Sequence, residues 1–189
     1  MLLRSAFAYL FFGLAAVSAR TPPKVYMIRH AEKPPNRDDH GLTLDGIKRA
    51  QCLRDIFGQD SDYNIGHIMA PTVKWISPPD GEHRRAYMTV LPLANDLGLE
   101  VDAHCSRKGT QCVADTIRNY NGPGNILIAW RHKNMGEIQE LLGSYDPLEY
   151  PEDRFDLIWT IPFPYDEVTD IKSEFCPGLD SRPVLVVQH

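Results

Sequence analysis

Two arginine-histidine pairs, Arg29-His30 and Arg131-His132, each end an apolar run of this chain. Arginine offers a planar fork of donors that matches the oxygens of a phosphate group. Histidine can act both as a nucleophile and as a proton carrier near neutral pH. One such pair is a weak signal, because many pairs of this kind are surface accidents. Two of them in similar settings suggest phosphate chemistry, provided that the fold brings them together.

The apolar runs before the two pairs, Val25–Ile28 and Asn125–Trp130, have the composition of buried strands. Strands that alternate with helices predict an α/β fold, a three-layer sandwich of a mainly parallel sheet with helices on both faces. The carboxyl ends of parallel strands face one crevice, so His30 and His132 are expected to meet there.

The remaining elements follow from apolar spacing and from turn residues. Helices are predicted from the N-cap Thr43 to Gly58, and over Arg85–Leu97, Val113–Tyr120 and Met135–Leu142. Further strands are predicted at Ile65–Ala70 and Val73–Ile76, followed by a turn-rich loop at Ser77–Gly81. The tail from Tyr145 has apolar pieces at Leu157–Ile161 and Val184–Val187, the second as an edge strand. This tail is expected to cover an open flank of the sheet or to form a wall that selects the substrate.

A third cationic segment, Arg84-Arg85-Ala86, opens the second predicted helix. Arg85 would add another guanidinium fork at a helix N-terminus, which itself favours an anion. Arg84, the preceding residue, is the alternative candidate for this anion-binding role.

These segments resemble, in the same order, the motifs of the histidine phosphatase superfamily, also called phosphoglycerate mutase-like. Arg29-His30 resembles its Arg-His-Gly/Ala motif. Leu42-Thr43-Leu44-Asp45-Gly46 with Ala50 resembles its "Leu-Thr-x-x-Gly…Ala" motif. Ser77 with Arg85-Ala86 and Thr89 resembles its "Ser…Arg-Ala-x-x-Thr" motif. Ile126–Trp130 before His132 resembles its second histidine motif. The resemblance spans roughly Val25 to Gly143.

The resemblance implies a role for each site residue. His30 would be the nucleophile and would form a phosphohistidine. Arg29 and Arg85 would clamp the phosphoryl group, and His132 would donate hydrogen bonds to its oxygens. Neither a metal nor a cofactor is implied. Activity is expected to be fastest below neutral pH, since a protonated His132 donates best.

The chain also departs from the family pattern. The gap between Ser77 and Arg85 is longer than usual, and Lys133 follows the second histidine where Gly, Ser or Asp is more common. The general acid stays open, with four candidates, Glu82, Asp96, Asp102 and Asp115.

Residues 1–19 have the pattern of a signal peptide, with Arg4 before an apolar run and Val17-Ser18-Ala19 before the cut. A membrane anchor is the alternative, although the apolar run is shorter than the roughly 20 residues of a spanning helix. Residues 20–189 are expected to form a single histidine phosphatase-like domain, secreted and without a membrane contact after cleavage. The formal net charge is −5 and no basic stripe occurs, so nucleic acid is not an expected partner. The oligomeric state stays open.

Four cysteines are present, Cys52, Cys105, Cys112 and Cys176, and they allow three disulfide connectivities. We favour Cys105 with Cys112, which flank a short loop, and therefore Cys52 with Cys176. A zinc site is the alternative, but no Cys-x-x-Cys spacing supports it.

The sequence thus predicts a metal-independent phosphatase that hydrolyses a small phosphorylated substrate through a phosphohistidine. A non-catalytic protein of the same fold that binds a phosphorylated or other anionic ligand is the alternative. A mutase is a third option, which the secretory pattern and the short chain disfavour.

Overall fold

A computed structural model describes residues 21–36, 38–77 and 80–180 of the 189-residue chain. The expected signal peptide and the expected strand at Val184–Val187 therefore lie outside the described residues.

The centre of the molecule is a six-stranded sheet with the order β5-β2-β6-β1-β7-β8. Its strands are β1 (Val25–Arg29), β2 (Ile65–Met69), β5 (Val101–Asp102), β6 (Asn125–Trp130), β7 (Leu157–Ile161) and β8 (Asp170–Ser173). The four strands from β5 to β1 are parallel, and β7 and β8 add to the β1 edge in antiparallel orientation. Strands β1 and β6, which carry the two arginine-histidine pairs, are direct neighbours in the middle of the sheet.

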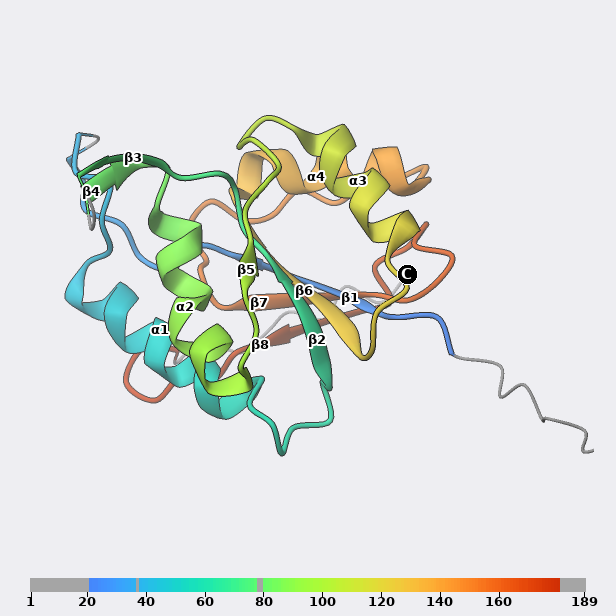
Figure 1. The fold of residues 1–189 in the computed structure, drawn as a ribbon, viewed down its shortest axis with the longest axis horizontal. Helices are drawn as coiled ribbons and strands as arrows, with labels where there is room; N and C mark the ends of the chain where they lie inside the picture. The colour runs from blue at the N-terminus through green and yellow to red at the C-terminus, as the bar shows by residue number, and fades with distance from the viewer. Residues whose placement is uncertain (1–20, 37, 78–79, 181–189) are drawn as a thin grey trace, which may run out of the picture.

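Helices cover both faces of this sheet, as Figure 1 shows. Helices α1 (Leu44–Ile56) and α2 (Arg85–Leu97) lie on one side, and α3 (Thr110–Asn119) and α4 (His132–Leu142) lie on the other. Alternate side chains of β1 enter two separate apolar cores, with Met27 facing α3 and α4 and Ile28 facing α1 and α2. The predicted three-layer α/β sandwich is confirmed.

Several element boundaries differ from the sequence prediction. The predicted strand at Val73–Ile76 does not join the main sheet but forms a separate hairpin, β3 (Lys74–Ser77) with β4 (Asp80–Glu82). Helices α3 and α4 each begin three residues earlier than predicted, and α4 therefore starts at His132 itself. None of the described helices is long and apolar enough to span a membrane.

The tail returns to the sheet and is tied covalently to helix α1. Cys52 on α1 forms a disulfide with Cys176 beyond β8, across 124 residues of sequence. Cys105 and Cys112 close a short loop at the start of α3. Both favoured disulfide pairs are therefore present.

A buried ion cluster on Arg49 makes a second link between the tail and α1. The Arg49 side chain is 3% exposed and pairs with Glu32 at 2.7 Å, Glu174 at 2.6 Å and Asp180 at 2.7 Å. These hydrogen-bonded carboxylates hold the pKa of Arg49 above its usual value although burial opposes them, so it stays charged. Burial raises the pKa of Glu174 to about 8, with Arg49 opposing that rise.

We predict that Arg49→Ala lowers the free energy of unfolding by about 3–5 kcal/mol, because it leaves buried carboxylates without their cation. Urea denaturation measures the loss. The deficit should shrink as the pH is lowered and the carboxylates take up protons. Arg54→Ala on the same helix is the control, because its pair with Asp96 is on the surface and should matter little. Equal losses in the two variants would contradict this account.

Candidate active site

His30 sits at the carboxyl end of β1, where the sheet holds its backbone. Its amide donates to the carbonyl of Trp130 at 3.0 Å, which extends the β1–β6 ladder by one residue. Its Nδ1 lies 2.8 Å from the carbonyl oxygen of Ala31. A carbonyl oxygen can only accept, so Nδ1 carries the hydrogen and Nε2 keeps its lone pair. His30 is 7% exposed and has the tautomer that a nucleophile at Nε2 needs.

Thr89 on α2 fixes the peptide that orients His30. Its Oγ1 accepts from the amide of Ala31 at 2.9 Å and donates to the carbonyl of Arg85 at 2.8 Å. One buried hydroxyl therefore joins the first turn of α2 to the turn after β1. This gives the "Arg-Ala-x-x-Thr" segment a physical reason, because Thr89 couples the position of Arg85 to that of His30.

Helix α1 braces the same turn through close backbone contact. The amide of Thr43 donates to the carbonyl of Glu32 at 3.0 Å, and the hydroxyl of Thr43 caps the helix by accepting from the amide of Gly46 at 3.1 Å. A Cβ at Gly46 would lie 2.4 Å from the Glu32 carbonyl oxygen, closer than real contacts allow. Only glycine fits there, which explains the glycine of the "Leu-Thr-x-x-Gly" motif.

Burial and positive charge keep His30 neutral. Desolvation is the main cause that lowers its pKa from 6.5 to about 4, and the charges of Arg29, Arg85 and His132 lower it further. These three groups are therefore close enough to act on His30. The structure thus brings together the four residues that the sequence singled out.

Arg29 has a second task that the sequence did not reveal. Its Nη1 donates to the carbonyls of Glu152 at 2.7 Å and Arg154 at 2.5 Å, within a stretch of the tail that we call the tail loop (residues 150–155). Its guanidinium also lies 3.8 Å from the ring centroid of Phe155. Its Nε is buried and has no hydrogen-bond partner among the described residues. Arg29 anchors the tail loop, and its part in phosphate binding stays a prediction that the free Nε supports.

Arg85 is the first residue of α2 and reaches towards the loop before α1. Its Nε donates to the carbonyl of Gly41 at 3.2 Å, and its Nη2 donates to the carbonyl of Asp39. Its competitor Arg84 lies 3.5 Å from Asp80 of the hairpin. The charge of Arg85 is among the main influences on His30.

His132 opens α4 with a ring that is 11% exposed, and neither ring nitrogen has a hydrogen-bond partner among the described residues. Desolvation first, then the charge of Arg29, lowers its pKa from 6.5 to about 4. Free His132 is thus neutral just below neutral pH, which removes the simple reason for an acidic optimum. Lys133, the atypical residue, pairs with Glu152 of the tail loop at 3.2 Å, and Glu152 also lies 3.7 Å from His132 Nε2.

A groove of about 480 Å³ runs from His132 along α4 and the tail. Four exposed carboxylates line it, those of Glu137, Glu140, Glu149 and Glu152. The site therefore has an acidic side along α4 and a cationic side at α2.

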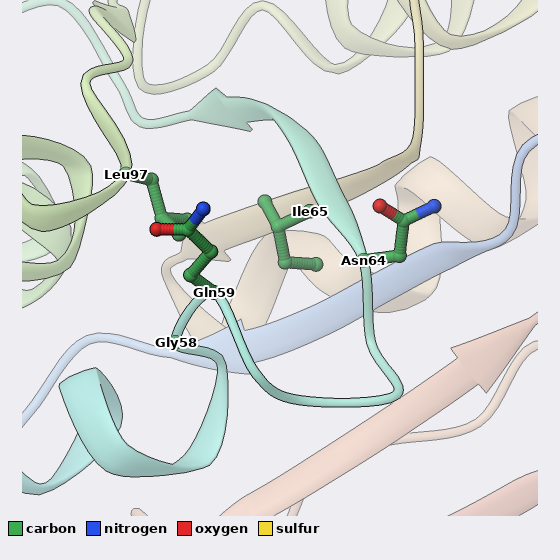
Figure 2. A pocket seen from close by; sticks show the side chains of 5 residues that line it. All are labelled: Gly58, Gln59, Asn64, Ile65 and Leu97. Atoms are coloured by element: carbon green, nitrogen blue, oxygen red, sulfur yellow. The ribbon is translucent and has the colours of Figure 1, made fainter.

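A second, smaller cavity of about 190 Å³ lies near the start of β2 and the end of α1, at the opposite edge of the sheet (Figure 2). Its lining residues carry no ionisable side chain: Gly58, Gln59, Asn64, Ile65 and Leu97. It therefore offers neither a nucleophile nor a cation for phosphate chemistry.

The four carboxylates named as candidate acids are all bound elsewhere. Glu82 lies 4.0 Å from Lys74, and Asp96 pairs with Arg54. Asp102 is held by His67 and His104, and Asp115 accepts from Gln111. The carboxylate that the structure does bring to a site histidine is that of Glu152, which sequence reasoning missed because it lies in the tail, outside every motif.

Arg107 is a further residue at this edge that the sequence did not single out. It lies between β5 and α3, and its charge lowers the pKa of Arg85, after the main effect of burial and against that of Asp39. No periodic pattern or motif covers this loop, so the basic side chain of Arg107 is the one sequence signal that could have identified it.

Two groups of described residues approach the spacing of a metal site: His104 with Cys105 and Cys112, and Glu174 with Cys176 and Asp180. In both, the cysteines are disulfide-bonded, and a disulfide lacks the thiolate that binds zinc. In the second group, Arg49 already supplies the cation. Neither group fits a metal ion, so the zinc alternative finds no support.

No protein-family model and no curated protein sequence matches the chain. Solved structures do match it. A protein assigned as the phosphohistidine phosphatase SixA from Agrobacterium tumefaciens has a TM-score of 0.56 at 16% identity, over 80% of this chain and 98% of that chain. A protein histidine phosphatase SixA complexed with tungstate has a TM-score of 0.57 at 14% identity, over 80% and 97%.

A phosphoserine phosphatase from Entamoeba histolytica, in complex with 3-phosphoglyceric acid, has a TM-score of 0.51 at 17% identity, over 80% of this chain and 97% of that chain. The chain therefore has the fold of these phosphatases. This confirms the fold that the resemblance implied. In this fold, the turn after β1 places His30 at the carboxyl ends of the central strands.

We predict that His30 and His132 titrate near pH 4, far below the ordinary 6.5 of histidine. NMR titration of the imidazole resonances should show two such groups, one of which disappears in His30→Gln and the other in His132→Gln. Nitrogen shifts should place the hydrogen of His30 on Nδ1. His104→Gln is the control and should remove neither resonance. A midpoint near 6.5 for His30 would mean that the ring is not buried among cations.

Proposed function

We propose that the protein hydrolyses phosphate monoesters through a phosphohistidine on His30. The observation that carries the proposal is the state of this ring. Its Nδ1 is bound to the Ala31 carbonyl, and its low pKa leaves Nε2 unprotonated at neutral pH. Cations around it neutralise an approaching phosphoryl group, which is the main need of this chemistry.

The reaction has two displacements. In the first, His30 Nε2 forms a bond to phosphorus, the ester P–O bond breaks, and the leaving oxygen takes a proton from solvent. In the second, water attacks phosphorus and releases a proton to solvent, the P–N bond breaks, and phosphate leaves as His30 becomes neutral again. Arg29 Nε, Arg85 and His132 would donate to the phosphoryl oxygens in both steps. The charge of the two arginines does the work that a metal ion does elsewhere, so the proposal needs no metal.

We predict that wild-type protein hydrolyses a chromogenic aryl phosphate with chelator present and that His30→Ala abolishes this activity. Activity should persist into mildly acidic solution, because the pKa of His30 is about 4 and Nε2 keeps its lone pair above that pH. His104→Gln is the matched control, because His104 is exposed and its ring is held by Asp102. Activity that survives His30→Ala, or that chelator removes, would refute the mechanism.

Calorimetry with tungstate separates an enzyme from a binding protein of the same fold. Arg85→Ala should weaken tungstate binding, since a charge-assisted donor is lost, and exposed Arg54→Ala should not. Tungstate binding that depends on Arg85 without turnover of any ester would favour the non-catalytic alternative. Equal affinity in wild type and Arg85→Ala would show that the anion site lies elsewhere.

We also propose that the protein acts outside the cell, because its two disulfides are typical of an oxidising compartment. We predict that secreted material begins near Arg20 and that thiol titration after denaturation without reductant finds no free cysteine. N-terminal sequencing of the secreted protein tests the first part. An intact Met1 in the medium, or two free thiols, would contradict the proposal.

A further inference from the structure

The loop between β5 and α3 brings Arg107 to the same edge of the sheet as His30. Strand β5 is parallel to β2 and ends at Asp102, so the residues that follow emerge at the carboxyl edge. The carbonyl of Arg107 accepts from the indole Nε1 of Trp130 at 3.2 Å, and Trp130 is the last residue of β6, two positions before His132. Arg107 is thus tied to the strand that delivers the second site histidine.

The charge of Arg107 acts on Arg85 and is not among the main influences on the nucleophile. That charge acts on Arg85 and on His83, whose pKa values are lowered chiefly by burial and then in part by Arg107. The strongest charge effects on His30 come instead from Arg29, Arg85 and His132. Arg107 therefore extends the cationic side of the site away from the point where phosphorus would be attacked.

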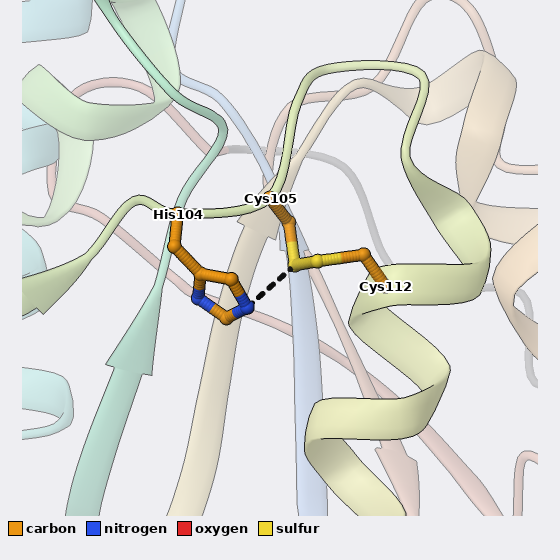
Figure 3. Close-up of side chains that lie close together, drawn as sticks. All are labelled: His104, Cys105 and Cys112. Carbon is orange, nitrogen blue, oxygen red and sulfur yellow. Dashed lines mark hydrogen bonds between the residues drawn. A yellow bond between two sulfur atoms is a disulfide. The ribbon is translucent and has the colours of Figure 1, made fainter.

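The backbone of this loop is held at several points. The Cys105–Cys112 disulfide closes it, with the two Cα atoms 5.7 Å apart (Figure 3). The amide of Thr72 donates to the carbonyl of Cys105 at 2.9 Å, and the amide of Gly109 donates to the carbonyl of Ser106 at 2.8 Å. A loop fixed in this way presents its side chains at little entropic cost on binding.

The side chain of Arg107 is a donor that lacks an acceptor. Its Nε is buried without a hydrogen-bond partner, and no salt bridge joins it to a carboxylate within the described part of the chain. Three other arginines of this part of the molecule, Arg49, Arg84 and Arg154, do have a carboxylate partner. A buried N–H of a cation is costly to leave unmatched, so the geometry suits an anion that arrives with the ligand.

We infer that Arg107 determines substrate specificity by binding a second oxyanion, a phosphate or carboxylate group, of a substrate whose reacting phosphoryl group lies at His30. The inference rests on the proposed function and deepens it, because it names a doubly anionic phosphate ester as the substrate class. The Cys105–Cys112 disulfide positions Arg107 for this contact.

The test compares three substrates of equal chain length: an alkyl phosphate, the matching alkanediol bisphosphate and the matching ω-carboxyalkyl phosphate. The quantity measured is the ratio of kcat/KM for each doubly anionic ester to that for the alkyl phosphate. Arg107→Ala should lower at least one ratio about tenfold to a hundredfold, as expected for one hydrogen bond to a charged group, and Arg107→Lys should lower it less. Which ratio falls shows whether the second group is phosphate or carboxylate.

Lys108→Ala is the matched control, because Lys108 is the exposed basic neighbour on the same loop and should leave both ratios unchanged. The double variant Cys105→Ser/Cys112→Ser should lower the same ratio as Arg107→Ala and lower it no further when combined with it. An equal fall of kcat/KM for all three esters in Arg107→Ala would assign Arg107 to the phosphoryl clamp instead. Unchanged ratios would leave it as a surface residue. Either result overturns the inference.

A binding experiment keeps this test separate from the proposed function. Calorimetry compares methylenebisphosphonate with methylphosphonate, neither of which can be hydrolysed as an ester. Wild type should prefer the bisphosphonate, and Arg107→Ala should lose that preference while Lys108→Ala keeps it. If no ester is turned over but this pattern holds, the proposed hydrolysis fails and the second anion site stands. If esters are turned over through His30 but neither assay depends on Arg107, the inference fails and the hydrolysis stands.

Discussion

The turn formed by His30, Ala31 and Glu32 is the constraint on which the rest of the site depends. Neighbouring elements reach it from several sides: Trp130 holds the amide of His30, Thr89 holds the amide of Ala31, and α1 approaches the carbonyl of Glu32. The Ala31 carbonyl then fixes the imidazole. A strand end alone would leave this backbone free to move. In this protein, the geometry of the nucleophile is set by the packing of the helices and the sheet.

The tail completes this arrangement from the other side. Arg29 holds the tail loop through its carbonyl groups, and Arg49 holds the segment that follows β8 through Glu174 and Asp180. Because Arg49 also binds Glu32, the turn and the end of the described chain share one buried cation. The Cys52–Cys176 disulfide reinforces the same connection. The tail extends the sheet beside β1 through β7 and β8, as one of the two expectations had it, and its Glu152 lies beside His132. A part for the tail in selecting the substrate stays a prediction.

Sequence reasoning succeeded where the signal is local. The bounds of α2 follow from apolar spacing and from Gly98, which ends the helix with a φ of 65°. The two apolar runs likewise predicted the strands β1 and β6, whose carboxyl ends precede His30 and His132. It failed for β8, since Asp170–Ser173 is short and polar and becomes a strand only by pairing with β7. It also failed for the partners of Arg29, which lie 122–125 residues away and carry no side-chain signature, because the acceptors are backbone carbonyls.

Charge is distributed unevenly around the site, and this matters more than the net charge of the chain. A formal charge of −5 would by itself repel a phosphate ester. Yet two arginines, Arg29 and Arg85, act on His30, whereas Glu32 and Glu174 pair with Arg49 and other carboxylates line the outer groove of α4. In a partly buried site the local field is screened less than the field of distant surface charges. The same cations that attract an anion also keep His30 unprotonated, so substrate binding and activation of the nucleophile arise from one arrangement of charge.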